Sequence, residues 1–210
     1  MARVQGIVSD YAGVLTAPLA ASFRRYSELT GVPLEALGAA LAALAERDGE
    51  NPLFALERGE ITSATFLERV GDEVSAAIGR TIDLGDFPRQ YFAGLTPNEP
   101  MLDWLRRARA GHGLRLALLT NNVREWEPLW RGEHIEELFE TIVDSGFVGL
   151  RKPDPRIYAL TLERLGLAAE ECVFVDDLAP NVATARELGF HAILFADAEQ
   201  AIGEIEALLR

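Results

Sequence analysis

Residues 4–16, VQGIVSDYAGVLT, decide how this chain folds. A short apolar run ends abruptly at Asp10 and is followed by a glycine and further apolar residues. Such a run predicts a strand of a parallel sheet that is buried on both faces. In open α/β sheets, ligands bind beyond the carboxyl ends of the strands, which is where Asp10 is expected to lie. Asp10 is therefore either a strand-end turn residue or a reacting group.

The pattern between residues 17 and 95 is helical throughout. Leu34, Leu37 and Leu41 recur at helical spacing, and Pro33 stands just before them, where a helix begins. The same span contains no strand pattern. It therefore predicts a helical subdomain that is inserted after the first strand.

Residues 96–210 alternate between short apolar runs and helical stretches. The predicted strands of this part are residues 114–119, 141–143, 172–175 and 191–194. A helix carrying both Trp126 and Trp130 is predicted after the first of these, and its two indoles are expected to pack in the core or at an interface. Strands that alternate with helices of about ten residues indicate a parallel, doubly wound sheet. The sequence thus predicts an α/β core made of residues 1–16 and 96–210.

Composition and charge exclude several classes of partner. The 210 residues carry a formal net charge of -13, which argues against binding to nucleic acid and gives no support for adhesion to an anionic membrane. Cys172 is the only cysteine, so no intrachain disulfide is possible and a reducing compartment is expected. No apolar segment approaches the length that crosses a bilayer. These features predict a cytoplasmic protein. The sequence leaves its oligomeric state open, either a monomer or a homodimer.

Polar groups stand at four predicted strand or loop ends. They are Asp10, then Thr120 with Asn121, then Lys152, then Asp176 with Asp177. Because strand ends of a parallel sheet converge at one edge, the four can meet at one site. Carboxylates brought together repel one another unless a cation neutralises them, and magnesium prefers oxygen ligands of this kind. Lys152 is the only lysine beside nineteen arginines, and its ammonium suits the oxygens of a phosphoryl group.

The four motifs and their order resemble the haloacid dehalogenase (HAD) superfamily. The residues that carry the resemblance are Asp10 in SDYAGVLT, Thr120 in LLTNN, Lys152 in GLRKPDPRIY, and Asp176 with Asp177 in VFVDDLAPNVATARELG. The resemblance covers the whole chain and is most specific in the last two motifs. It implies a Rossmann-like core, with residues 17–95 as the small helical cap of the family. The N-terminal phosphatase-like domain of soluble epoxide hydrolases is among the similar relatives.

The resemblance also implies a two-step hydrolysis of a small phosphorylated substrate. Asp10 would attack the phosphorus and form a covalent aspartyl intermediate, which water then hydrolyses. Lys152 would hold Asp10 and a substrate oxygen, while Thr120 and the backbone of Asn121 would bind the phosphoryl group. Tyr11 is expected to line the substrate pocket.

The implied metal ion is Mg²⁺. Its ligands would be Asp10, the backbone carbonyl of Ala12, and Asp176 with Asp177 in support. Which of the last two carboxylates touches the metal directly is left open by the sequence.

Ala12 departs from the pattern of the family. Phosphatases of the family usually carry at this position an aspartate that acts as acid and base, and its loss is expected to cost about 10²–10⁴ in rate. A non-catalytic phosphate-binding or interaction protein on the same fold therefore stays open. Dehalogenases need no such acid but generally use no metal, so the Asp176–Asp177 pair speaks against them. Phosphonoacetaldehyde hydrolases require a cap lysine, and residues 17–95 contain none.

Overall fold

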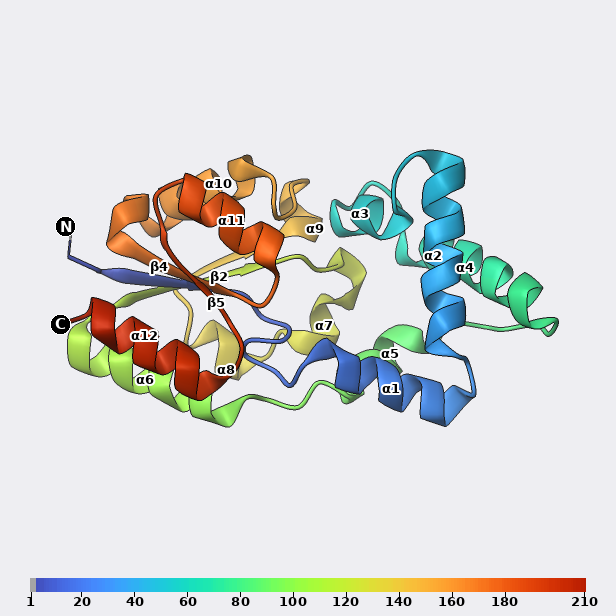
Figure 1. Cartoon of the computed structure of the whole chain (residues 1–210), viewed down its shortest axis with the longest axis horizontal. Coiled ribbons are helices and arrows are strands. Elements are labelled where there is room, and N and C mark those ends of the chain that lie inside the picture. The colour runs from blue at the N-terminus through green and yellow to red at the C-terminus, as the bar shows by residue number, and fades with distance from the viewer. Residues whose placement is uncertain (1–2) are drawn as a thin grey trace.

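The computed structural model describes residues 3–210, with the side chains of residues 133 and 134 outside that description. Within these residues, one parallel five-stranded sheet has the order β3-β2-β1-β4-β5 (Figure 1). Its strands are β1 (Gly6–Ser9), β2 (Arg115–Thr120), β3 (Thr141–Asp144), β4 (Cys172–Asp176) and β5 (His191–Leu194). The predicted doubly wound α/β fold is confirmed.

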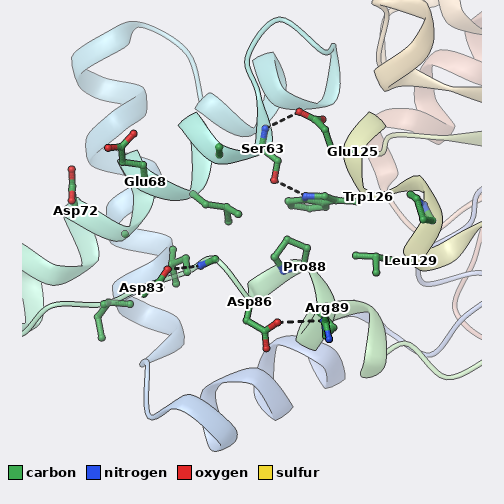
Figure 2. Close-up of a pocket in the computed structure, with 17 residues that line it drawn as sticks. Ser63, Glu68, Asp72, Asp83, Asp86, Pro88, Arg89, Glu125, Trp126 and Leu129 are labelled. Carbon is green, nitrogen blue, oxygen red and sulfur yellow. Dashed lines mark hydrogen bonds and ion pairs between the residues drawn. The ribbon is translucent and has the colours of Figure 1, made fainter.

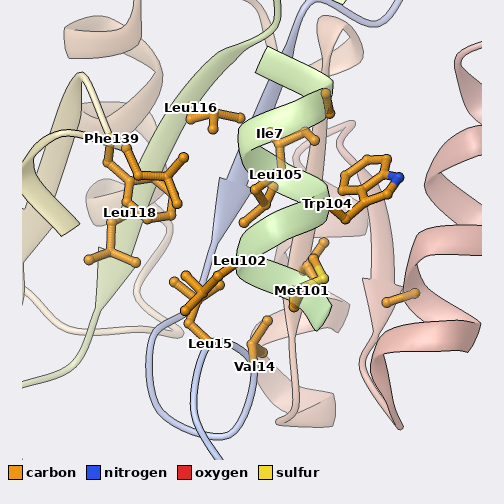
Figure 3. Close-up of a cluster of buried hydrophobic side chains, with 14 of the residues drawn as sticks. Ile7, Val14, Leu15, Met101, Leu102, Trp104, Leu105, Leu116, Leu118 and Phe139 are labelled. Atoms are coloured by element: carbon orange, nitrogen blue, oxygen red, sulfur yellow. The ribbon is translucent and has the colours of Figure 1, made fainter. Parts of the chain in front are cut away.

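β1 occupies the centre of the sheet because its apolar side chains are buried on both faces. Successive side chains of a strand point to opposite faces. Ile7 packs with α6 (Glu99–His112) and α12 (Ala198–Leu208), as Figure 3 shows for Leu102 and Leu105 of α6. Val8 packs on the other face, where α10 (Pro155–Leu165) and α11 (Ala179–Glu187) lie.

Five helices between β1 and α6 form a group at one end of the molecule, away from the sheet (Figure 1). They are α1 (Leu19–Thr30), α2 (Leu34–Asp48), α3 (Pro52–Glu57), α4 (Ser63–Ile78) and α5 (Phe87–Ala93). They share a buried cluster of their own that includes Leu44 and Val74. The chain enters and leaves this group at adjacent points, since Thr16 and Pro97 form an antiparallel bridge.

The helices have local causes in the sequence. Thr62 caps α4 by accepting a hydrogen bond from the N–H of Thr65 at 3.2 Å, and Asp154 caps α10 by accepting one from Arg156 at 2.9 Å. Among residues 3–210, no single helix is long and apolar enough to cross a membrane. Only α1 and α2 taken together match such a span in length and composition, and they are bent by 109°.

The prediction of one helix carrying Trp126 and Trp130 is wrong. The chain instead forms a 3₁₀ turn, η1 (Arg124–Trp126), followed by a single helical turn, α7 (Glu127–Trp130). Pro128 lies in the first turn of α7, where its missing N–H is tolerated. Both indoles are buried as expected, but Trp126 joins the cluster of the five helices and Trp130 joins the cluster beneath the sheet.

The remaining short elements connect the sheet to its helices. They are α8 (Glu133–Glu136), α9 (Ser145–Val148) and the 3₁₀ turn η2 (Ala169–Glu171). α9 follows β3 directly because Asp144 accepts a hydrogen bond from the N–H of Gly146 at 2.9 Å and so caps the turn.

Candidate functional site

A buried charge cluster lies at the carboxyl edge of the central strands. Asp10 follows β1 and Asp176 ends β4, and because these strands are parallel neighbours their two carboxylates lie close together. The Nζ atom of Lys152 lies between them, 2.8 Å from Oδ1 of Asp10 and 2.6 Å from Oδ2 of Asp176. The Lys152 side chain is 1% exposed. A charge buried this deeply requires charged partners, since an unpaired buried ion is strongly destabilising.

Asn121 fixes the backbone that carries Lys152. Its Nδ2 donates to the carbonyl oxygen of Lys152 at 2.9 Å, and its Oδ1 accepts from the N–H of the same residue at 2.7 Å. Thr120, the last residue of β2, is buried and lines the same cavity as Asn121. The Asn121 side chain is thus engaged with the backbone of Lys152, and the role predicted for the Asn121 backbone stays a prediction.

The two adjacent carboxylates after β4 have different environments. Oδ1 of Asp176 accepts hydrogen bonds from the N–H of Leu178 and from Nδ2 of Asn181, both at 2.9 Å, while its Oδ2 accepts one from Lys152. Over residues 3–210, the Asp177 carboxylate makes no ion pair and no hydrogen bond to another residue's side chain. It lies against Gly13, where any Cβ would collide with it. Asp176 is held by the protein and Asp177 is available to a ligand.

Gly13 and Asn181 belong to the site although neither was among the predicted site residues. Gly13 has a φ of 91°, a backbone conformation that favours glycine. Asn181 lies in the first turn of α11, so its amide points back to the end of β4. Gly13 lies within the motif DYAGV and Asn181 within VDDLAPN. Their place inside these motifs is the sequence signal that could have identified them as site residues.

Asp10, Asp176 and Asp177 together form an oxygen-rich group suited to a cation. One carboxylate oxygen from each lies within 4.8 Å of the other two. Burial raises the pKa of Asp10 to about 7, with Lys152 lowering it and Asp176 and Asp177 raising it further. Three carboxylates beside one ammonium leave an excess of negative charge, and oxygen donors of this kind fit Mg²⁺. Ala12, the fourth predicted ligand, is half-buried beside Asp10.

A cavity of about 360 Å³ opens onto this cluster and extends among the five helices. Asp10, Lys152 and Asp177 line its polar end. Tyr11 lines it as predicted, and its ring also packs 5.1 Å from that of Trp130. The cavity is therefore shared between the sheet edge and residues 17–95, the helical segment that contains α1 to α5.

Arg151 joins the helical segment to the loop that carries Lys152. Its Nε lies 2.6 Å from Oε2 of Glu57 at the end of α3, and its guanidinium carbon lies 3.9 Å from the centre of the Phe54 ring. Burial raises the pKa of Glu57, and the Arg151 charge opposes that rise. This ion pair lies at the edge of the cavity, next to its polar end.

A larger cavity of about 780 Å³ is not lined by Asp10, Asp176 or Asp177. Its walls come from α4, α5 and the η1–α7 turn (Figure 2). Trp126, Leu67 and Leu84 line both cavities and form the wall between them. Nε1 of Trp126 donates a hydrogen bond to Oγ of Ser63 at 2.7 Å, which holds the indole in this wall (Figure 2).

Three relatives are similar in sequence. Acyl-CoA dehydrogenase family member 10 of Mus musculus is 35% identical over 78% of this chain and 15% of its own length. Bifunctional epoxide hydrolase 2 of the same species is 29% identical over 94% of this chain and 37% of its own length. The chain thus spans well under half of these relatives. Phosphatase MT3486 of Mycobacterium tuberculosis is 30% identical over 91% of this chain and 87% of its own length.

Solved structures agree in fold. The magnesium complex of the HAD family enzyme BT-2542 from Bacteroides thetaiotaomicron superposes with a TM-score of 0.65 at 22% identity, over 94% of this chain and 95% of that one. The L-2-haloacid dehalogenase RSc1362 superposes with a TM-score of 0.68 at 20% identity, over 98% of this chain and all of that one. A family model described as "haloacid dehalogenase-like hydrolase" matches residues 4–189. The chain belongs to the haloacid dehalogenase-like hydrolase family.

Proposed function

We propose that this protein is a magnesium-dependent phosphatase that acts through an aspartyl-phosphate on Asp10, with residues 17–95 acting as a cap over the site. One observation carries the proposal: a single buried ammonium, Lys152, bridges Asp10 and Asp176 at the polar end of a cavity. The Mycobacterium relative, which is named a phosphatase and matches along most of its length, supports the same reaction class.

In the first step, a carboxylate oxygen of Asp10 forms a bond to phosphorus, and the bond from phosphorus to the leaving oxygen breaks. The leaving group takes that electron pair. Lys152 neutralises Asp10 and donates to a phosphoryl oxygen, while the Thr120 hydroxyl and the Asn121 backbone N–H donate to the others. In the second step, the oxygen of a water molecule forms a bond to phosphorus, and the bond from phosphorus to the Asp10 oxygen breaks. Asp10 keeps that electron pair and is regenerated as a carboxylate, while the attacking water loses a proton to solvent and inorganic phosphate leaves.

We assign the magnesium ion to Asp10, Asp177 and the backbone carbonyl of Ala12. Asp177 is preferred over Asp176 because both oxygens of Asp176 already accept hydrogen bonds from the protein. When bound, the ion would offset the negative charge of the phosphoryl group. Asp176 then serves to position Lys152.

The magnesium site is tested by thermal unfolding. A ligand that binds only the folded state adds about 2.7 kcal/mol of stability at a hundredfold excess over its Kd. Millimolar Mg²⁺ should therefore raise the Tm of the wild type and of a control, Asp72→Asn, whose aspartate is exposed and outside the cluster. It should not raise the Tm of Asp177→Asn. An equal rise in all three proteins would show that the ion binds elsewhere.

Ala12 favours a second candidate function, that of a phosphate-binding protein that hydrolyses no substrate. Without an acid at this position, the leaving group departs unprotonated. Acyl phosphates and p-nitrophenyl phosphate, which leave as stable anions, should therefore react much faster than alkyl phosphates. Incubation with both classes, followed by intact mass for a phosphoenzyme on Asp10, separates the candidates. Binding of vanadate with no turnover of either class would support the binding protein.

A further inference from the structure

The cavity above Asp10 changes character along its length. Its polar end lies at the sheet edge, and the rest is walled by aromatic and aliphatic side chains of the helical segment, such as Phe23, Leu41 and Phe66. Among the lining residues within 17–95, Glu57 is the only charged one, and Arg151 neutralises it. A ligand that reaches past the polar end therefore meets mainly aromatic and aliphatic side chains, and the polar groups among them are the Tyr91 hydroxyl and the Arg151–Glu57 pair.

We propose that the organic part of the substrate is a hydrocarbon, so that the protein acts on phosphate monoesters or acyl phosphates of apolar chains. This inference rests on the phosphatase function proposed above. The phosphoryl group would lie at Asp10 and Lys152, and the chain would occupy the apolar part of the cavity. A sugar phosphate would bury several hydroxyl groups against walls that offer few hydrogen-bond partners, which is unfavourable.

The size of the cavity limits the chain. A liquid water molecule occupies about 30 Å³, so the 360 Å³ of the cavity accommodates on the order of a dozen non-hydrogen atoms. Trp126 closes the cavity at the wall it shares with the 780 Å³ cavity, and Ser63 holds the indole there. Trp126 is therefore expected to set the longest chain that binds.

Linear acyl phosphates provide the main probe, because their leaving group is a carboxylate whose acidity hardly changes with chain length. The bond from phosphorus to the acyl oxygen breaks, the carboxylate departs with the electron pair, and no proton is needed. Chain length then reports on burial rather than on the missing acid at Ala12. Each methylene that enters the cavity should raise kcat/KM about fourfold, until the cavity is full.

Two substitutions change the cavity and one serves as a control. Leu41→Trp fills the cavity from α2 and should shorten the preferred chain. Trp126→Ala joins the two cavities and should lengthen it. Leu34→Trp is the matched control, because Leu34 is half-buried on the same helix and packs on the same cluster without lining the cavity. Leu41→Trp keeps the test decisive if Trp126→Ala does not fold.

Linear alkylphosphonates, which cannot be hydrolysed, give a second readout through Tm at fixed concentration. The inference would be supported if Tm rises with the chain length of the phosphonate. The chain length at which this rise ends should be shorter in Leu41→Trp and unchanged in Leu34→Trp. A flat series in both assays, with acetyl phosphate turned over as fast as longer homologues, would overturn it and leave the phosphatase function standing. Chain-dependent phosphonate binding with no turnover of any acyl phosphate would overturn the phosphatase function instead. Faster turnover of sugar phosphates than of alkyl phosphates would also overturn the inference.

Discussion

At the scale of single residues, Lys152 is the centre of the site. Burial by itself would lower the pKa of its ammonium, but the attraction of Asp10 and Asp176 outweighs burial and raises that pKa. Lys152 therefore stays charged, as the proposed function requires of a group that would hold Asp10 and a phosphoryl oxygen together. A compact point charge fits between two carboxylates, whereas the planar fork of arginine does not. This explains why one lysine remains in a chain that otherwise uses arginine.

The Lys152→Arg variant should fold like the wild type but bind phosphate analogues more weakly. We expect at least a tenfold weaker affinity for vanadate, because the larger guanidinium displaces Asp10 or Asp176. Titration of vanadate against both proteins measures the change, and Arg156→Lys, an exposed neighbour, serves as control. Unchanged vanadate affinity in Lys152→Arg would remove Lys152 from the binding site.

Ala12→Asp should restore the missing acid. The new carboxylate would lie two residues after Asp10 and could protonate the leaving group, so turnover of alkyl phosphates should rise by about 10²-fold or more. Turnover of acyl phosphates should rise much less in its first step, because their leaving group needs no proton. Rapid alkyl phosphate hydrolysis by the wild type would mean that another residue already serves as the acid.

Asp144 predicts how stability depends on pH. Burial raises its pKa from 3.8 to about 6, and the hydrogen bond from the Gly146 N–H lowers it only in part. Between those pH values the folded state holds the proton more tightly than the unfolded state, so stability falls as pH rises. In the Asp144→Asn variant, the side chain at this position does not titrate, so this contribution to the pH dependence is absent. Relative to the wild type, its free energy of unfolding should rise by up to about 3 kcal/mol between pH 4 and pH 7.

Urea denaturation of both proteins at several pH values measures this difference. The comparison cancels the contributions of other titrating groups, since they are common to both proteins. A constant difference across the range would mean that Asp144 titrates alike in the folded and unfolded states.

At the scale of elements, α3 is the contact between the helical segment and the loop that carries Lys152. The Arg151–Glu57 ion pair is mostly buried, with side chains 18% and 13% exposed, and Phe54 stacks against the guanidinium. Because Lys152 follows Arg151 directly, the position of α3 and that of the Lys152 ammonium are linked. The pair between Arg58 and Glu50 is more open, with side chains 21% and 47% exposed, and has no such role.

A double-mutant cycle compares the two pairs. Substitution of glutamine for Glu57, for Arg151 and for both should give a coupling energy in unfolding of about 1–2 kcal/mol. The same cycle on Glu50 and Arg58 should give less than about 1 kcal/mol, because exposed pairs are well solvated. Equal coupling energies would show that burial adds nothing to the Arg151–Glu57 pair.

At the scale of the whole molecule, the sheet order gathers the site. With β1 in the centre and β2 and β4 on either side, groups at positions 10, 120 and 176 meet at one edge, and position 152 reaches them from the loop before α10. The helical segment stands over the same edge and contributes about half of the residues that line the cavity. The site therefore depends on segments from nearly the whole chain.

The sequence by itself determined the strands, most of the helices and which charged side chains meet at the edge of the sheet. Buried strands, helix caps and prolines act through near neighbours, so β1, the cap at Asp154 and the ends of the helices follow from local pattern. The carboxylates and the single lysine were identified because parallel strands must end together. The one helix that was wrong contains Trp126 and Trp130, whose indoles are drawn into separate clusters.

Only the tertiary structure distinguished Asp176 from Asp177. Their neighbours in sequence are alike, but Lys152 and Asn181 reach Asp176 from other elements, while Asp177 lies against Gly13. The apolar cavity is likewise a property of the assembled helices, since its lining residues look like ordinary core residues in the sequence. Which polar group is satisfied, and which apolar face remains uncovered, depends on contacts between distant segments. Those contacts cannot be read from the local pattern of the sequence.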